Sequence, residues 1–142
     1  MREAEEGVAR AAECFAKGHN CAEAVLRGVC HAEGVDIPDG CLRMATPFGG
    51  GIGRSEDICG ALTGGVMGVG ACLGRVGADG DKTRSYDAAN ALFKGFVLAF
   101  GSPDCRVINK GDYVSPEHNV RCTGFVREAA RLAVLAIRRR GP

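Results

Sequence analysis

The sequence predicts an all-α fold, a compact bundle of five to six helices with a glycine-rich helix at its centre. Apolar residues recur at the helical spacing of three and four along most of the chain. No segment alternates apolar and polar residues with the period of two that a half-buried strand would show. The 142 residues suffice for one domain, and neither a repeat nor a shift in composition divides them. We therefore expect residues 1–142 to form a single helical domain.

The first third of the chain predicts two long helices and one short one. The first helix carries an apolar stripe and ends at Gly18. Asn20 with Glu23 three residues later resembles a capping box, so a second helix should begin there and end near Gly34. Residues 41–48 favour a short helix.

A glycine run at residues 49–53 predicts a loop whose backbone bends sharply or approaches another group closely. Ser55 then has the side chain of an N-cap, and Glu56 and Asp57 suit the positive end of a helix dipole. We therefore expect a third long helix from Ser55 to about Gly74.

The second half of the chain predicts three more helices. One covers residues 83–100, with Tyr86 and Phe93 among the residues on its apolar side. Ser102 and the proline after it resemble an N-cap followed by Pro at the first helical position, opening a short helix. After a loop, a last helix is expected over residues 120–138.

Charge and composition exclude several functional classes. Eighteen Lys and Arg against seventeen Asp and Glu leave a net charge of +1, which gives no reason to expect a nucleic-acid partner. The uncharged run at 58–74 is shorter than the roughly 20 residues of a membrane-spanning helix. The acidic N-terminus lacks the pattern of a signal peptide. We therefore expect a cytoplasmic protein with reduced thiols.

The eight cysteines include no CxxC pair, so any shared site must be assembled by the fold. Cys21, Cys59 and Cys105 each lie near the start of a predicted helix, where the backbone N–H groups should favour the thiolate and lower the thiol pKa. Cys122 lies one to two turns into the last helix and would be inert unless the other three converge on it. The remaining four are expected to be small buried hydrophobes: Cys14, Cys30, Cys41 and Cys72.

Gly60, Gly64 and Gly68 are spaced by four residues and form a row on the third long helix. Such a row lets another backbone or a flat ligand come close. One interpretation is tight helix packing, within the subunit or across a homodimer. The other is a cofactor groove that includes Gly60 and Gly64.

The motif Cys59-Gly60-Ala61-Leu62-Thr63-Gly64 reads as CGAxxG. Together with residues 18–26, 48–53, 100–106 and 121–122, it resembles the C_GCAxxG_C_C family over about residues 12–135. Members of this family are described as redox-active because of their cysteines. The resemblance places the family's four cysteines on Cys21, Cys59, Cys105 and Cys122, and implies a small helical protein with a redox or metal site. A similar module occurs in haem-carrying split-Soret cytochromes, but this chain has no CxxCH for covalent haem.

Three functional hypotheses follow for Cys21, Cys59, Cys105 and Cys122. The first is a redox-active protein that binds an iron–sulfur cluster for electron transfer with an unknown partner. The second is a thiol–disulfide redox protein that uses a reversible cysteine pair and no cofactor. The third is a structural zinc site in a module that dimerises through the Gly60, Gly64 and Gly68 face. The residues alone do not decide whether the chain is an enzyme.

Overall fold

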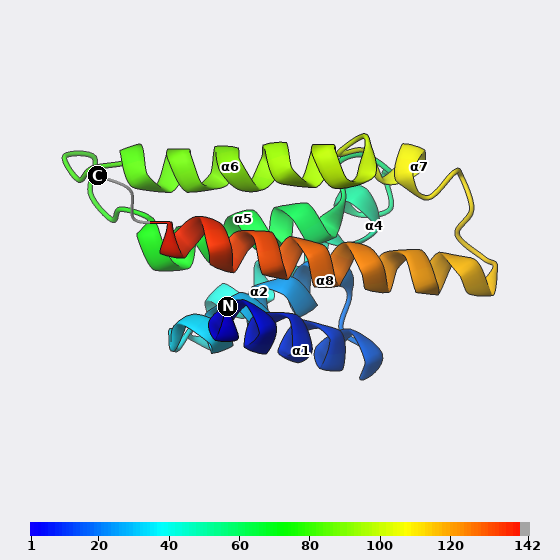
Figure 1. The fold of residues 1–142 in the computed structure, drawn as a ribbon, viewed down its shortest axis with the longest axis horizontal. Coiled ribbons are helices and arrows are strands. Elements are labelled where there is room, and N and C mark those ends of the chain that lie inside the picture. Colours follow the sequence, from blue (N-terminus) through cyan, green and yellow to red (C-terminus); the bar gives the residue numbers. More distant parts are fainter. Residues whose placement is uncertain (140–142) are drawn as a thin grey trace.

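A computed structural model describes residues 1–139, and over this range the chain consists of helices joined by irregular connections (Figure 1). The described part contains five long helices: α1 (Arg2–Ala16), α2 (Cys21–Glu33), α5 (Gly60–Leu73), α6 (Thr83–Phe100) and α8 (Pro116–Arg138). Four short helical turns lie between them: α3 (Asp39–Arg43), η1 (Thr46–Phe48), α4 (Gly49–Ile52) and α7 (Cys105–Ile108). The predicted all-α class is confirmed.

The helical segments outnumber the expected five to six. Residues 39–52, where we expected one short helix and a loop, fold instead as α3, η1 and α4 in succession. Pro47 and the glycines after it interrupt a continuous helix here, because Gly50 and Gly51 have left-handed φ values of 66° and 68°.

The long helices lie in layers with α5 near the centre. In Figure 1, α6 lies above α5 and α8, and α1 and α2 lie below them. Helix α5 packs against α2, α6 and α8, which matches the expected central position of the glycine-rich helix. Helices α2, α5 and α8 all begin at the same end of the molecule, where α4 and α7 also lie (Figure 1). None of the helices in residues 1–139 has the length and apolarity needed to cross a membrane.

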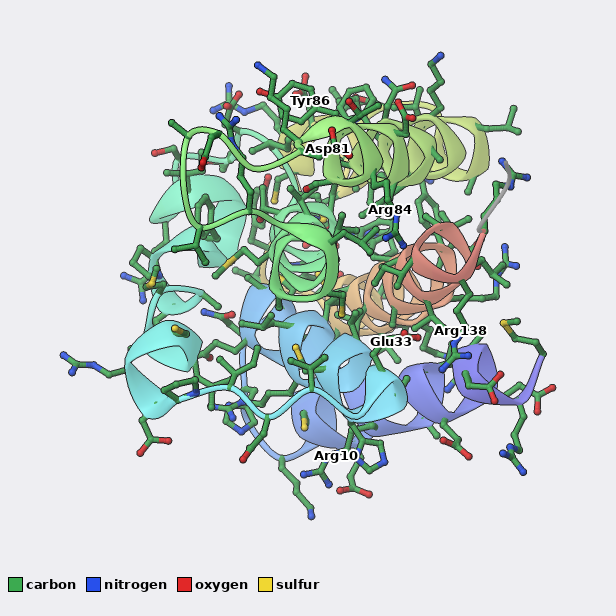
Figure 2. The ribbon with its side chains drawn as sticks, turned by 90° about the vertical axis from the view of Figure 1, so that its left-hand side faces the viewer. Arg10, Glu33, Asp81, Arg84, Tyr86 and Arg138 are labelled. Atoms are coloured by element: carbon green, nitrogen blue, oxygen red, sulfur yellow. The ribbon has the colours of Figure 1, made fainter. Side chains whose placement is uncertain are left out.

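The predicted limits of α2 are confirmed by its caps. The Glu23 backbone N–H donates to Asn20 Oδ1 at 2.9 Å, and the Asn20 backbone N–H donates to Glu23 Oε1 at 2.8 Å. This is the reciprocal capping box. Gly34 ends the helix with a φ of 66°. At this C-terminal end Arg138 Nε of α8 lies 2.8 Å from Glu33 Oε2, a pair labelled in Figure 2.

Other predicted helix starts are wrong. Helix α5 begins at Gly60 with Cys59 as its N-cap, so Ser55 caps no helix. Helix α7 begins at Cys105 with Asp104 as its N-cap, and not at Pro103 with Ser102 as its N-cap. Helix α8 begins at Pro116, four residues earlier than expected.

The apolar side of α6 also differs from the prediction. Tyr86 is 65% exposed and Phe93 is 40% exposed. The face that packs on the bundle carries Ala88, Leu92 and Phe96, of which Phe96 was also expected on the apolar side. The buried face differs from the predicted one because apolar residues lie on both sides of this helix. Packing against α5 and α8 determines which side is buried.

The row of α5 glycines is covered by α2 of the same chain. A Cβ atom on Gly64 would lie 2.5 Å from the carbonyl oxygen of Ala22, and one on Gly68 would lie 2.7 Å from Val29 Cγ1. The row therefore serves close packing within the subunit. Because α2 occupies this face, the expected homodimer surface through Gly60, Gly64 and Gly68 is wrong.

Candidate functional site

A cavity of about 430 Å³ lies at the end of the bundle where α2 and α5 begin. Its wall contains the four cysteines that the sequence singled out: Cys21, Cys59, Cys105 and Cys122. The rest of the lining comes from Gly50, Arg54, Glu56, Gly60, Asn109, Tyr113, His118 and Phe125. The fold thus brings together four thiols that are far apart along the chain.

Each cysteine reaches the cavity from a different element. Cys21 is the first residue of α2, and Cys105 is the first residue of α7. Cys59 is the N-cap of α5. Cys122 comes from the second turn of α8, so it lacks the helix-start position of the other three.

Backbone hydrogen bonds hold Cys59 and Cys105 next to each other. The Cys59 N–H donates to the Pro103 carbonyl at 2.8 Å, and the Cys105 N–H donates to the Asp57 carbonyl. Ile58 and Asp104 form an isolated antiparallel bridge between these contacts. Because Ile58 is held in this pairing and Glu56 has a left-handed φ of 61°, the residues after Ser55 are not helical and α5 starts only at Gly60.

Two glycines allow the close approach of the cavity walls. Gly51 has a φ of 68°, and a Cβ there would lie 2.9 Å from Cys105 Cβ. A Cβ on Gly60 would lie 2.5 Å from Cys21 Sγ. Of the two glycines expected in a cofactor groove, Gly60 lines the cavity, whereas Gly64 lies beneath α2.

Asn109 is a buried polar residue between two of the thiols, with 1% of its surface exposed. Its Nδ2 donates to Cys105 Sγ at 3.6 Å. The thiol of Cys122 donates to Asn109 Oδ1 at 3.8 Å. Sequence reasoning missed this residue, because a lone Asn at the end of a short helix looks like an ordinary turn residue.

His118 and Tyr113 were also missed as site residues. His118 Nε2 lies 3.3 Å from Cys122 Sγ, four residues along the same helix. The Tyr113 ring meets the His118 ring edge to face, with centroids 5.4 Å apart. The signal that could have found them is Ser115 followed by Pro116, a typical N-cap and first helical residue. An earlier helix start places His118 and Cys122 on one face.

Burial dominates the electrostatics of Cys21, Cys59 and Cys122. It raises the pKa of Cys21 and of Cys59 above the ordinary value, and it raises the pKa of Cys122 to about 12. Backbone N–H groups of Gly50 and Ala22 favour the Cys21 thiolate, but less strongly than burial opposes it. The expectation that helix starts lower the pKa of Cys21 and Cys59 is therefore wrong.

The other predicted cysteines lie outside the cavity lining. Cys14 and Cys30 are buried, each 5% exposed, as expected of small hydrophobes. Cys72 is half-buried, but Cys41 is exposed, which contradicts its predicted place in the core. The short helix α3 buries none of its residues, so Cys41 has no core to enter.

Among residues 1–139, no three His, Cys, Asp or Glu side chains form a group arranged to hold a metal ion. The donor set that is present consists of thiols around a cavity, with the His118 imidazole beside one of them. Thiolates are the ligands of iron–sulfur clusters and of many zinc sites.

The chain matches a known protein family. A family described as "Putative redox-active protein (C_GCAxxG_C_C)" matches residues 19–135. The chain belongs to the C_GCAxxG_C_C family. This match confirms the resemblance inferred from the motifs, although Cys59-Gly60 reverses the first two letters of the GCAxxG in the family name.

A relative of this C_GCAxxG_C_C protein occurs in Archaeoglobus fulgidus, where it is an uncharacterized protein. The two chains are 27% identical over 147 residues, and the match covers 97% of each. No solved structure matches the chain.

Proposed function

We propose that this C_GCAxxG_C_C protein binds an iron–sulfur cluster through Cys21, Cys59, Cys105 and Cys122 and uses it for electron transfer. The observation that carries the proposal is the single cavity lined by these four thiols. A bound cluster would supply one-electron chemistry at this end of the bundle.

The size of the cavity favours a cluster over a single ion. Zinc in a structural site draws each thiolate sulfur to about 2.3 Å from one point. Here the cysteines line a cavity with a volume of about 430 Å³. A polynuclear cluster needs this kind of space, because its irons are distributed around a core.

The surroundings of the sulfurs also suit a thiolate-bound cluster. Backbone N–H groups of Gly50 and Ala22 favour the Cys21 thiolate, and the Asn109 amide donates to Cys105. Hydrogen bonds of this kind stabilise the negative charge on sulfur and raise the cluster potential. The metal would displace the thiol protons that burial otherwise retains.

The alternative of thiol–disulfide exchange has weaker support. That reaction requires a thiolate as nucleophile. The raised pKa values of Cys21, Cys59 and Cys122 leave little thiolate at neutral pH. Structural zinc binding would use the same four ligands and is distinguished by metal content.

The test is the metal content of the anaerobically purified chain. We expect iron and acid-labile sulfide with visible absorbance in the wild type, and their loss in Cys59→Ser. Cys41→Ser is the matched control, because Cys41 is exposed and lies outside this cavity, and it should retain both.

Three results would contradict the proposal. A colourless, iron-free wild-type protein would exclude the cluster. Stoichiometric zinc without a redox response would select the structural zinc site. Reversible oxidation of two cavity thiols in a metal-free protein would select the disulfide mechanism.

A further inference from the structure

The outer side of α6 carries a second apolar stripe, which faces away from the bundle. Tyr86, Phe93 and Val97 lie on this stripe with Asn90 among them, at intervals of four, three and four residues. This spacing puts all four side chains on one face of the helix. Tyr86 and Phe93 are exposed. In Figure 2, Tyr86 lies on the outer side of α6, whereas Arg84 points toward α8.

The spacing of the stripe is that of a coiled-coil seam. Alternating intervals of four and three residues are those between the a and d positions of a heptad repeat. Tyr86 and Phe93 then occupy d positions, and Asn90 and Val97 occupy a positions. The buried residues of α6 fall outside these positions. The stripe is therefore suited to packing against another helix.

The charges beside the stripe favour the same helix of a second copy as the partner. Asp87 and Lys94 are exposed and occupy e positions, seven residues apart on one flank of the stripe. Neither makes an ion pair within residues 1–139.

In an antiparallel helix pair, the e positions of the two chains face each other. The aspartate of each copy then meets the lysine of the other, and a two-fold axis makes the two ion pairs equal. In a parallel pair, e positions face g positions, which here hold the uncharged Ala89 and Phe96. The charges therefore select the antiparallel orientation.

We propose that α6 binds the α6 of a second copy of this chain in antiparallel orientation, forming a homodimer. In this register Tyr86 packs against the partner's Val97, and Asp87 pairs with the partner's Lys94. Asn90 is a polar residue in the seam, which lowers the stability of the pair. One helix pair also buries an area at the low end of specific interfaces. We therefore expect a reversible dimer whose population rises with protein concentration.

This dimer would keep the two four-cysteine cavities apart. The C-terminal end of α6 lies beside the cavity, because Phe100 packs edge to face on Phe125, a residue of the lining. Antiparallel pairing therefore places the cavities at opposite ends of the paired helices. Dimerisation is thus independent of what the cavity binds, and oligomeric state and iron content test the two proposals separately.

The test is sedimentation equilibrium of the whole chain at low salt. The samples are kept reduced, so that the exposed Cys41 cannot form a disulfide between chains. The wild type should pass from monomer to dimer as its concentration rises. Asp87→Lys and Lys94→Asp should each weaken the dimer by about tenfold or more, because each variant places like charges opposite each other twice.

The double variant that combines Asp87→Lys with Lys94→Asp is the decisive sample. It restores both ion pairs with their charges reversed, so it should recover the wild-type affinity. Residues 87 and 94 are about 10 Å apart along their own helix, so pairing within one chain would not explain the recovery. A double variant that dimerises no better than the single variants would overturn the proposal.

A second comparison separates the stripe from general surface apolarity. Tyr86→Ala removes a seam side chain and should weaken the dimer by about tenfold or more. Leu98→Ala is the matched control, because Leu98 is exposed on the same helix but lies outside the seam positions. It should dimerise as the wild type does.

Two further results would overturn the proposal. A wild type that stays monomeric at every concentration would leave the stripe to a different protein. A wild-type dimer that Tyr86→Ala does not weaken would place the interface on another face of the molecule.

Discussion

Asn109 makes two of the cavity thiols chemically different. Its amide nitrogen faces Cys105, whereas its amide oxygen faces Cys122. The two sulfurs therefore have opposite hydrogen-bond roles toward the same side chain, because Cys105 accepts from the amide and Cys122 donates to it. The Asn109 carbonyl is held in turn by Arg121 at 3.1 Å, which fixes the residue between α7 and α8.

A prediction at the same scale concerns Cys30, a buried thiol away from the cavity. Burial, with a smaller contribution from Cys72, raises its pKa from 9.0 to about 12. The folded protein thus keeps this proton at pH values where the unfolded chain loses it. The stabilising contribution is complete below pH 9 and is lost as the pH rises toward 12.

We therefore expect the free energy of unfolding of the metal-free protein to fall with rising pH in this alkaline window. In Cys30→Ala the fall should be shallower, because the titrating thiol is gone. Denaturant unfolding at several alkaline pH values measures the slope. The exposed Cys41→Ala should keep the wild-type slope, and an unchanged slope in Cys30→Ala would contradict the explanation.

At the scale of the element, the glycines of α5 separate into packed and exposed positions. Gly64 lies against the Ala22 backbone, which cannot move without shifting α2. Gly70 has no atom within 4 Å of the position that a Cβ would take. The two glycines of one helix thus give opposite expectations for the same substitution.

Gly64→Ala should lower the free energy of unfolding by about 1–3 kcal/mol, because the added methyl group overpacks the contact with α2. Gly70→Ala should raise it by up to about 1 kcal/mol, because alanine is the better helix former. Chemical denaturation of both variants checks the pair. Equal effects would mean that helix propensity, and not the α2 contact, determines the outcome.

At the scale of the whole molecule, the cavity joins elements from most of the chain. Cys21 begins α2, Cys59 is the N-cap of α5, Cys105 begins α7, and Cys122 lies in the second turn of α8. A group bound to all four would connect these elements to each other. Binding should therefore stabilise the entire fold and not only the site.

We expect anaerobic reconstitution with iron and sulfide to raise the thermal unfolding temperature of the wild type. Cys59→Ser should show little or no increase, because it lacks one of the four ligands. Calorimetry of loaded and metal-free samples measures the difference, with Cys41→Ser as the control that should behave like the wild type. An increase of the same size in Cys59→Ser would show that iron binds elsewhere.

Much of the fold could be predicted from local patterns. The capping box of α2 is encoded within four residues, and the helical period needs only a few turns to be recognised. The start of α5 could not be predicted from Ser55, because the residues before Cys59 pair with residues around Asp104. His118 was missed for a related reason, since the start of α8 was placed four residues too late.

The sequence by itself determined the helical class, because helix periodicity is a property of neighbouring residues. It also identified Cys21, Cys59, Cys105 and Cys122, because the short motifs around them can be read in order along the chain. Only the tertiary structure decided that these thiols line one cavity and that Asn109, His118 and Tyr113 share it. It also reversed the expected pKa shift of Cys21 and Cys59, because burial depends on segments that pack from elsewhere in the chain. Local sequence carries the direction of a helix dipole but not the depth at which a thiol is buried.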